Sequence, residues 1–137
     1  MQILLAINGL SIPKLTQNSV QAGVVIFDCD SSRQILSNDL DDETAEKWQS
    51  QLLPQSVGVY SSTTTYAAWK YIPSTFVICQ NDKALPMAVA EAFIKGAKEA
   101  EPTAFDTLET CDAGHFPMLS QVEWTAQMLR RAAGENA

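Results

Sequence analysis

The second half of the chain shows the clearest pattern of apolar and polar positions. Residues 75–79, TFVIC, form a β-rich and almost wholly apolar run, which is typical of a strand buried on both faces of a parallel sheet. Residues 87–100 repeat apolar positions at helical spacing and predict an amphipathic helix. A second strand is predicted in residues 104–112 and a closing helix in residues 120–135. The order strand, helix, strand, helix is half of a doubly wound unit, so we predict an α/β fold.

The first half of the chain predicts short helices instead. Residues 37–53 combine capping residues and acids at their start with an apolar stripe, and Pro54 ends this helix. The candidate caps are Ser37, Asn38 and Asp39. Residues 54–70 predict two short helical pieces around a turn rich in serine and threonine, and residues 22–30 predict a short strand or an extended loop. We therefore expect a helical cap-like layer over about residues 10–70, without a sheet of its own, followed by an α/β part over residues 71–137.

The chain has the size and composition of one globular domain. Its 137 residues are 46% hydrophobic and 18% charged, so residues 1–137 are expected to form a single domain. A net charge of -7 argues against nucleic acid or an anionic membrane surface as a partner and favours a neutral or apolar small molecule. The apolar start MQILLAINGL is short and has no basic residue before it, so we expect neither a signal peptide nor a membrane span.

The cysteines and acids of the sequence predict no metal and no other cofactor. Cys29, Cys79 and Cys111 are widely spaced and odd in number, which suits free thiols in a reducing compartment and predicts a cytoplasmic protein. The acidic residues at positions 39–43 match the start of a helix and do not have the spacing of a calcium loop.

Asp82 and His115 are the candidate catalytic residues. Asp82 comes three residues after the strand predicted at 75–79, and His115, the only histidine, comes four residues after Cys111. Loops that follow neighbouring parallel strands meet at one edge of a sheet, so we expect the carboxylate and the imidazole to lie together. A carboxylate bonded to one ring nitrogen fixes the tautomer and leaves the other nitrogen free to act as a general base.

The two loops resemble those of a known family. ICQNDKALP (residues 78–86) and DAGHFPMLSQ (residues 112–121) are similar to the acid loop and the histidine loop of α/β-hydrolases, in the branch of esterases and hydroxynitrile lyases related to the plant salicylate-binding esterase. Residues 37–80 are similar to that branch's helical cap and its return to the sheet, with Trp69 at the junction. The resemblance runs from about Leu10 to the last helix. It implies that Asp82 is the acid and His115 the base of a catalytic triad.

The sequence departs from that family in its nucleophile. Family members carry a G-x-S-x-G elbow and an oxyanion hole in an earlier half, and this chain contains no such motif. The resemblance therefore implies that the serine, the oxyanion donors and about six strands are missing from this chain. Cys111 could serve as a replacement nucleophile, although a strand cysteine is far more often a small buried apolar residue.

Aromatic and sulfur side chains could line an apolar pocket beneath the cap. The candidate substrate-binding residues are Tyr60, Tyr66, Trp69, Phe116 and Met118. Trp48 could line the same pocket. The alternative role of all these side chains is ordinary core and cap packing, and we expect Trp48 to lie mostly in the core.

The sequence leaves three functions open. The chain could be a small-molecule enzyme without a serine nucleophile, in which Asp82 and His115 catalyse an isomerisation, cyclisation, elimination or dehydration. It could be an ester hydrolase whose nucleophile half comes from another chain, or a non-catalytic module that binds a ligand or partner. An apolar strand with an unpaired edge invites pairing with a second chain, so we expect a homodimer or a heterodimer with a related chain.

Overall fold

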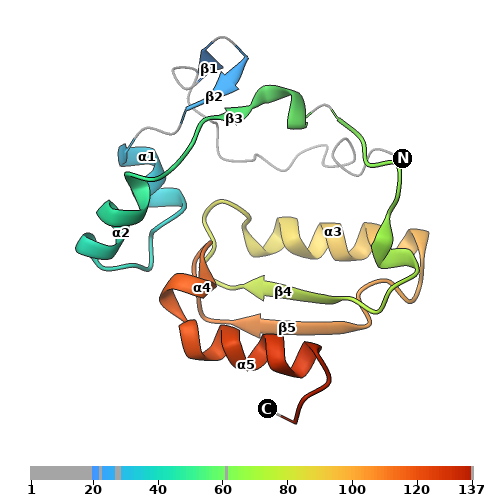
Figure 1. The fold of residues 1–137 in the computed structure, drawn as a ribbon. Coiled ribbons are helices and arrows are strands. Elements are labelled where there is room, and N and C mark those ends of the chain that lie inside the picture. The colour runs from blue at the N-terminus through green and yellow to red at the C-terminus, as the bar shows by residue number, and fades with distance from the viewer. Residues whose placement is uncertain (1–19, 22, 27–28, 61, 137) are drawn as a thin grey trace.

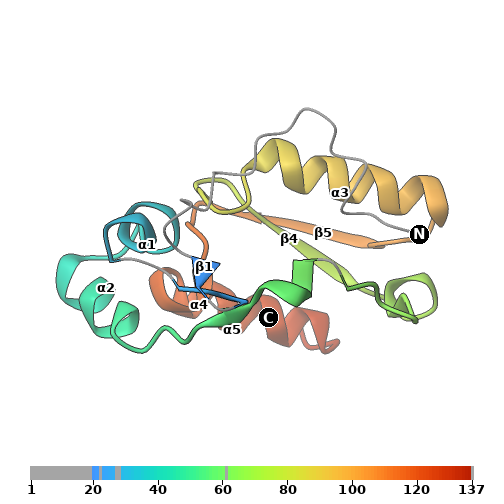
Figure 2. The same ribbon diagram turned by 90° about the horizontal axis from the view of Figure 1, so that it is seen from above.

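The α/β part of the molecule is built on two parallel strands. The computed structural model of the chain describes residues 20–21, 23–26, 29–60 and 62–136, which leaves the segment MQILLAINGL outside the described residues. The elements of the α/β part are β4 (Thr75–Cys79), α3 (Met87–Ala100), β5 (Thr107–Cys111), α4 (Pro117–Ser120) and α5 (Val122–Ala132). β4 and β5 pair in parallel, and both strands lie between α3 and α5 in Figures 1 and 2. The predicted α/β fold, with the order strand, helix, strand, helix, is therefore confirmed.

α3 packs on the strands through one apolar side. Val89, Ala90, Ile94 and Ala97 are buried on this helix, whereas Phe93, which the sequence places on the same side, is half-buried. Full burial of a valine or isoleucine side chain stabilises a fold by about 1.5–3 kcal/mol. The apolar spacing therefore explains both the position of α3 and its bounds, which are those predicted.

β4 is less covered than its sequence predicts. All five of its residues are half-exposed, and most residues of β5 are exposed. Within the described residues β5 is the one strand paired with β4, so the second edge of β4 has no strand beside it. The expectation of a strand buried on both faces is therefore wrong for the described structure. The apolar sequence of β4 is typical of a fully buried strand, but the described residues do not cover it completely.

The first half of the described chain contains two short helices and a small antiparallel sheet. α1 (Cys29–Ile35) and α2 (Asp42–Gln49) contact each other. β1 (Val20–Gln21), β2 (Val24–Val25) and β3 (Gln55–Ser56) pair in that order. The expectation of a layer without a sheet is wrong, because strands of two residues are too short to show an alternating pattern.

In this first half the helices also begin at other residues than predicted. Cys29 and Asp30, the last residues of the strand or loop predicted at 22–30, belong to α1 instead. α2 begins later than expected and is capped by Asp41, whose carboxylate accepts a hydrogen bond of 2.9 Å from the amide of Thr44. The two short helical pieces predicted in residues 54–70 are present as the 3-10 turns η3 (Val57–Tyr60) and η4 (Ala68–Lys70).

Candidate active site

Asp82 and His115 lie in contact at the carboxyl ends of β4 and β5. The Nδ1 atom of His115 is 2.9 Å from Oδ2 of Asp82, as the order of strands and loops predicts. The Asp82 side chain is only 7% exposed, whereas that of His115 is 35% exposed. The carboxylate is therefore screened from solvent while part of the imidazole can reach a ligand.

The Asp82 carboxylate is held by its own loop. Its Oδ1 atom accepts hydrogen bonds of 2.8 Å from the amides of Ala84 and Leu85. Burial alone would raise the pKa of Asp82, but the hydrogen bonds from His115 and from these two amides lower it below the ordinary value of 3.8. Asp82 is therefore ionised at neutral pH, and a carboxylate in this position favours a proton on Nδ1 of His115.

The two loops are joined because the strand pairing continues past the ends of β4 and β5. The amide of Gln80 donates to the carbonyl of Cys111 at 2.9 Å, and the amide of Asn81 donates to the carbonyl of Ala113 at 3.0 Å. The Asn81 side chain also donates to the carboxylate of Asp112. The backbone of the Asp82 loop is thus fixed against the backbone of the His115 loop.

Cys79 and Cys111 lie directly beneath these loops as free thiols. They occupy paired positions on β4 and β5, with 3.6 Å between their sulfur atoms. Burial and the neighbouring Cys111 raise the pKa of Cys79 to about 12, and burial also raises the pKa of the Cys111 thiol. Protonated, buried thiols are poor nucleophiles, so Cys111 acts as a packing residue in this structure.

An apolar groove of about 390 Å³ lies next to the histidine loop. Phe116 and Met118 line it from the histidine side, and Trp48 and Leu52 line it from the α2 side. The ring of Phe116 also contacts the His115 ring, with 5.1 Å between their centroids. Trp48 is 38% exposed, so the expectation that it lies mostly in the core is wrong. It lines the groove instead, which is the other role expected for it.

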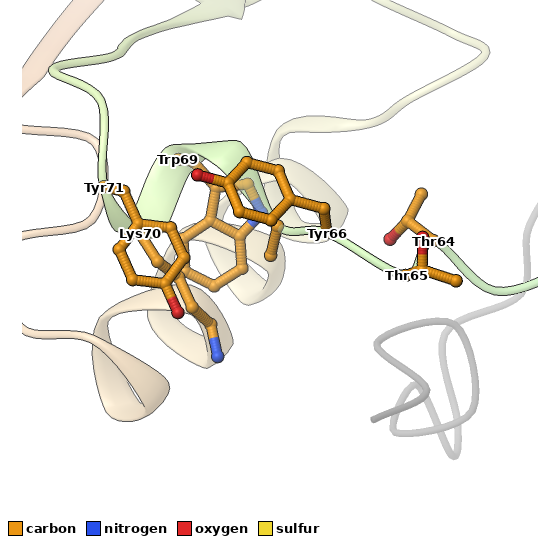
Figure 3. A pocket seen from close by; sticks show the side chains of 7 residues that line it. Thr64, Thr65, Tyr66, Trp69, Lys70 and Tyr71 are labelled. Atoms are coloured by element: carbon orange, nitrogen blue, oxygen red, sulfur yellow. The ribbon is translucent and has the colours of Figure 1, made fainter.

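Tyr66 and Trp69 lie elsewhere, before the start of β4: Trp69 is part of η4, and Tyr66 precedes it. They line a separate pocket of about 240 Å³, in which the rings of Tyr66 and Tyr71 stack 5.4 Å apart (Figure 3). Trp69 packs on Phe105, which precedes β5, at a ring distance of 5.8 Å. Asp82 and His115 follow the opposite ends of the same strands, about 16 Å away for a five-residue strand.

The predicted substrate-binding set is therefore split by the structure. Phe116 and Met118 lie beside the Asp82–His115 pair, and Tyr66 and Trp69 do not, because η4 precedes β4 whereas the pair follows it. The side chain of Tyr60 lies outside the part that the structure describes. In the described residues there is no cluster of three or more metal-ligating side chains, and no described helix has the length and apolarity needed to cross a membrane.

Known proteins match this chain over most of its length. The sequence pattern of the "Alpha/beta hydrolase family" matches residues 9–128, a region that includes Asp82 and His115. The "Alpha/beta hydrolase nvfD" of Aspergillus novofumigatus is similar to this chain, with 36% identity over 115 residues. The aligned region covers 84% of this chain and 44% of that protein, so the chain spans less than half the length of this curated relative. On these grounds the chain belongs to the alpha/beta hydrolase family.

Proposed function

We propose that the chain acts on a small molecule and that His115, oriented by Asp82, is its general acid and base. The observation that carries the proposal is the 2.9 Å contact between Nδ1 of His115 and Oδ2 of Asp82. Within the described residues no side chain hydrogen-bonds to Nε2 of His115, and the imidazole is partly exposed. A buried acceptor on one nitrogen and an accessible second nitrogen are what a general base requires.

The proposed reaction transfers one proton out of the substrate and one back. Nε2 removes a proton from a carbon or oxygen of the substrate, and the resulting imidazolium is stabilised by the Asp82 carboxylate. Return of that proton to a different atom completes an isomerisation or a cyclisation. Return to a departing hydroxyl group completes a dehydration, in which the carbon–oxygen bond breaks and water leaves. None of these reactions forms an acyl-enzyme, so none requires a serine.

The groove beside Phe116 supports a largely apolar substrate. Its lining is mainly apolar and includes a few polar side chains, those of Ser37 and two glutamines. A volume of about 390 Å³ is that of a small-molecule site. Phe116 contacts His115 directly, so a ligand in the groove would lie beside the imidazole.

Ester hydrolysis is the second candidate, with the nucleophile supplied by another chain. It is supported by the length comparison, since the chain spans only 44% of a relative that is named a hydrolase. In that case His115 would take the proton of the incoming serine hydroxyl. A third possibility, a non-catalytic binding module, predicts ligand binding without turnover.

The test uses small metabolites extracted from the source organism. The purified chain is incubated with the extract in water enriched in ¹⁸O, and the products are compared by mass spectrometry with those of His115→Ala. We expect a substrate to be consumed by the wild type only, without ¹⁸O in the product. Incorporation of ¹⁸O would favour hydrolysis, and identical profiles for the two proteins would contradict catalysis by His115.

Location and assembly are proposed on chemical grounds. The three free thiols suit the reducing cytoplasm. The uncovered edge of β4 supports a homodimer or a heterodimer with a related chain.

A further inference from the structure

The turn between α1 and α2 contacts both loops of the Asp82–His115 pair. The side-chain amide of Asn38 donates a 3.0 Å hydrogen bond to the carbonyl of Asn81. The carboxylate of Asp39 accepts a 2.5 Å hydrogen bond from the amide of Gly114. Asn81 directly precedes Asp82, and Gly114 directly precedes His115. Asn38 therefore binds the residue before Asp82, and its neighbour Asp39 binds the residue before His115.

The turn is itself braced by Arg33 of α1. The Arg33 guanidinium donates to the carbonyl of Leu40 at 3.0 Å, to the carbonyl of Ser37, and to the carboxylate of Asp42 at 2.9 Å. Ser37 and Leu40 are buried. A guanidinium that binds both ends of a turn restricts its backbone, so Asn38 and Asp39 are presented in a fixed geometry.

Gly114 packs closely against the turn between α1 and α2. A Cβ atom on Gly114 would lie 2.8 Å from Cγ of Asp39 and 2.9 Å from Oδ1 of Asn38. Both distances are shorter than van der Waals contact, so any larger residue would displace the side chains of Asp39 and Asn38. The close approach brings the Asp39 carboxylate against the amide of Gly114, the residue before His115.

We propose that Asn38 and Asp39 are positioning residues that set the geometry of the Asp82–His115 contact from outside both loops. The loops also contact each other, because the amide of Asn81 donates to the carbonyl of Ala113. Ala113 precedes Gly114, so this bond does not hold Gly114 itself. Beyond it, the Asp39 contact fixes the backbone that carries His115. This inference rests on the proposed function of the pair.

The test measures how fast the Nδ1 proton of His115 exchanges with water. His115 is the only histidine, so its ring signals need no assignment in an NMR spectrum. We expect Asp39→Ala to accelerate this exchange roughly tenfold, as loss of a hydrogen bond to a charged group would, and Asn38→Ala to accelerate it less. Asp39→Asn should restore slow exchange, since its carboxamide oxygen can still accept the bond from Gly114.

Asp41→Ala is the matched control. It removes an aspartate two positions along the chain and uncaps α2, because the Asp41 carboxylate accepts its hydrogen bond from Thr44 of that helix. We expect this variant to lower the stability of α2 and to leave the exchange rate of the Nδ1 proton of His115 within twofold of the wild-type rate.

Exchange at the wild-type rate in Asp39→Ala, or equal acceleration in Asp41→Ala, would overturn the positioning role. If Asp39→Ala does not fold, Asn38→Ala decides by the same criterion. Absence of a protected Nδ1 proton in the wild type itself would instead contradict the proposed function of the pair, so the two failures are distinguishable.

Discussion

The imidazole of His115 meets the carboxylate of Asp82 through one 2.9 Å contact between two loops that are 33 residues apart in sequence. The contact exists because β4 and β5 are parallel and end at the same edge of the sheet. The fold of the chain thus brings one carboxylate and one imidazole into contact.

Ionisation of Asp82 should make the folded chain sensitive to acid. Its pKa is lowered in the folded state, so its contribution to the free energy of unfolding is present above the ordinary value of 3.8 and is lost as the pH falls through the folded-state pKa. We expect the wild type to lose more stability than Asp82→Asn between about pH 6 and about pH 3, measured by urea unfolding. Glu91→Gln, on the exposed side of α3, is the control and should behave like the wild type. Equal losses in the wild type and Asp82→Asn would contradict the expectation.

Substitution of Gly114 should separate the histidine loop from the turn that contacts it. Gly114→Ala places a Cβ within 2.8 Å of Asp39, and we expect the free energy of unfolding to fall by about 1–3 kcal/mol. The control is Gly96→Ala, because Gly96 lies within α3 and an added Cβ would meet no atom within 4 Å apart from its chain neighbours and the backbone of its own helix. That substitution should raise stability by up to about 1 kcal/mol. The two changes measured by chemical denaturation should therefore have opposite signs, and a neutral Gly114→Ala would show that the close approach is not required.

The isolated chain should not cleave activated esters. The sequence contains no G-x-S-x-G elbow, and the loss of even one oxyanion donor costs an enzyme a factor on the order of 10². We expect nitrophenyl acetate hydrolysis by the wild type to equal that of an Asp82→Ala, His115→Ala double variant. A clear excess in the wild type would mean that the chain supplies a nucleophile that its sequence does not reveal.

The uncovered edge of β4 should be paired in solution. β4 is apolar along its length yet half-exposed, and β5 covers only one of its edges in the described part of the chain. We expect light scattering after size exclusion to give about twice the chain mass of 15.0 kDa, or association with a related chain. A stable, well-folded monomer at micromolar concentration would be the contrary result.

The parts of the structure that could be predicted are those that depend on local pattern and element order. α3 follows from its apolar spacing, and the contact between Asp82 and His115 follows from two parallel strands with loops at one edge. The bond between Asp39 and Gly114 could not be predicted in this way, because it joins residues 75 positions apart through a turn with no regular pattern. Trp48 shows the same limit, since an apolar stripe does not reveal whether it faces a core or a groove.

The most direct test of the central claim is the tautomer of His115 in the folded chain. Ring nitrogen shifts, measured by NMR at neutral pH on protein labelled with ¹⁵N-histidine, distinguish a proton on Nδ1 from a proton on Nε2. With Asp82 ionised 2.9 Å from Nδ1, we predict that neutral His115 carries its proton on Nδ1 and has a free lone pair on Nε2. A neutral ring protonated mainly on Nε2 would contradict the claim, because Asp82 would then not orient His115 and Nε2 could not act as the base.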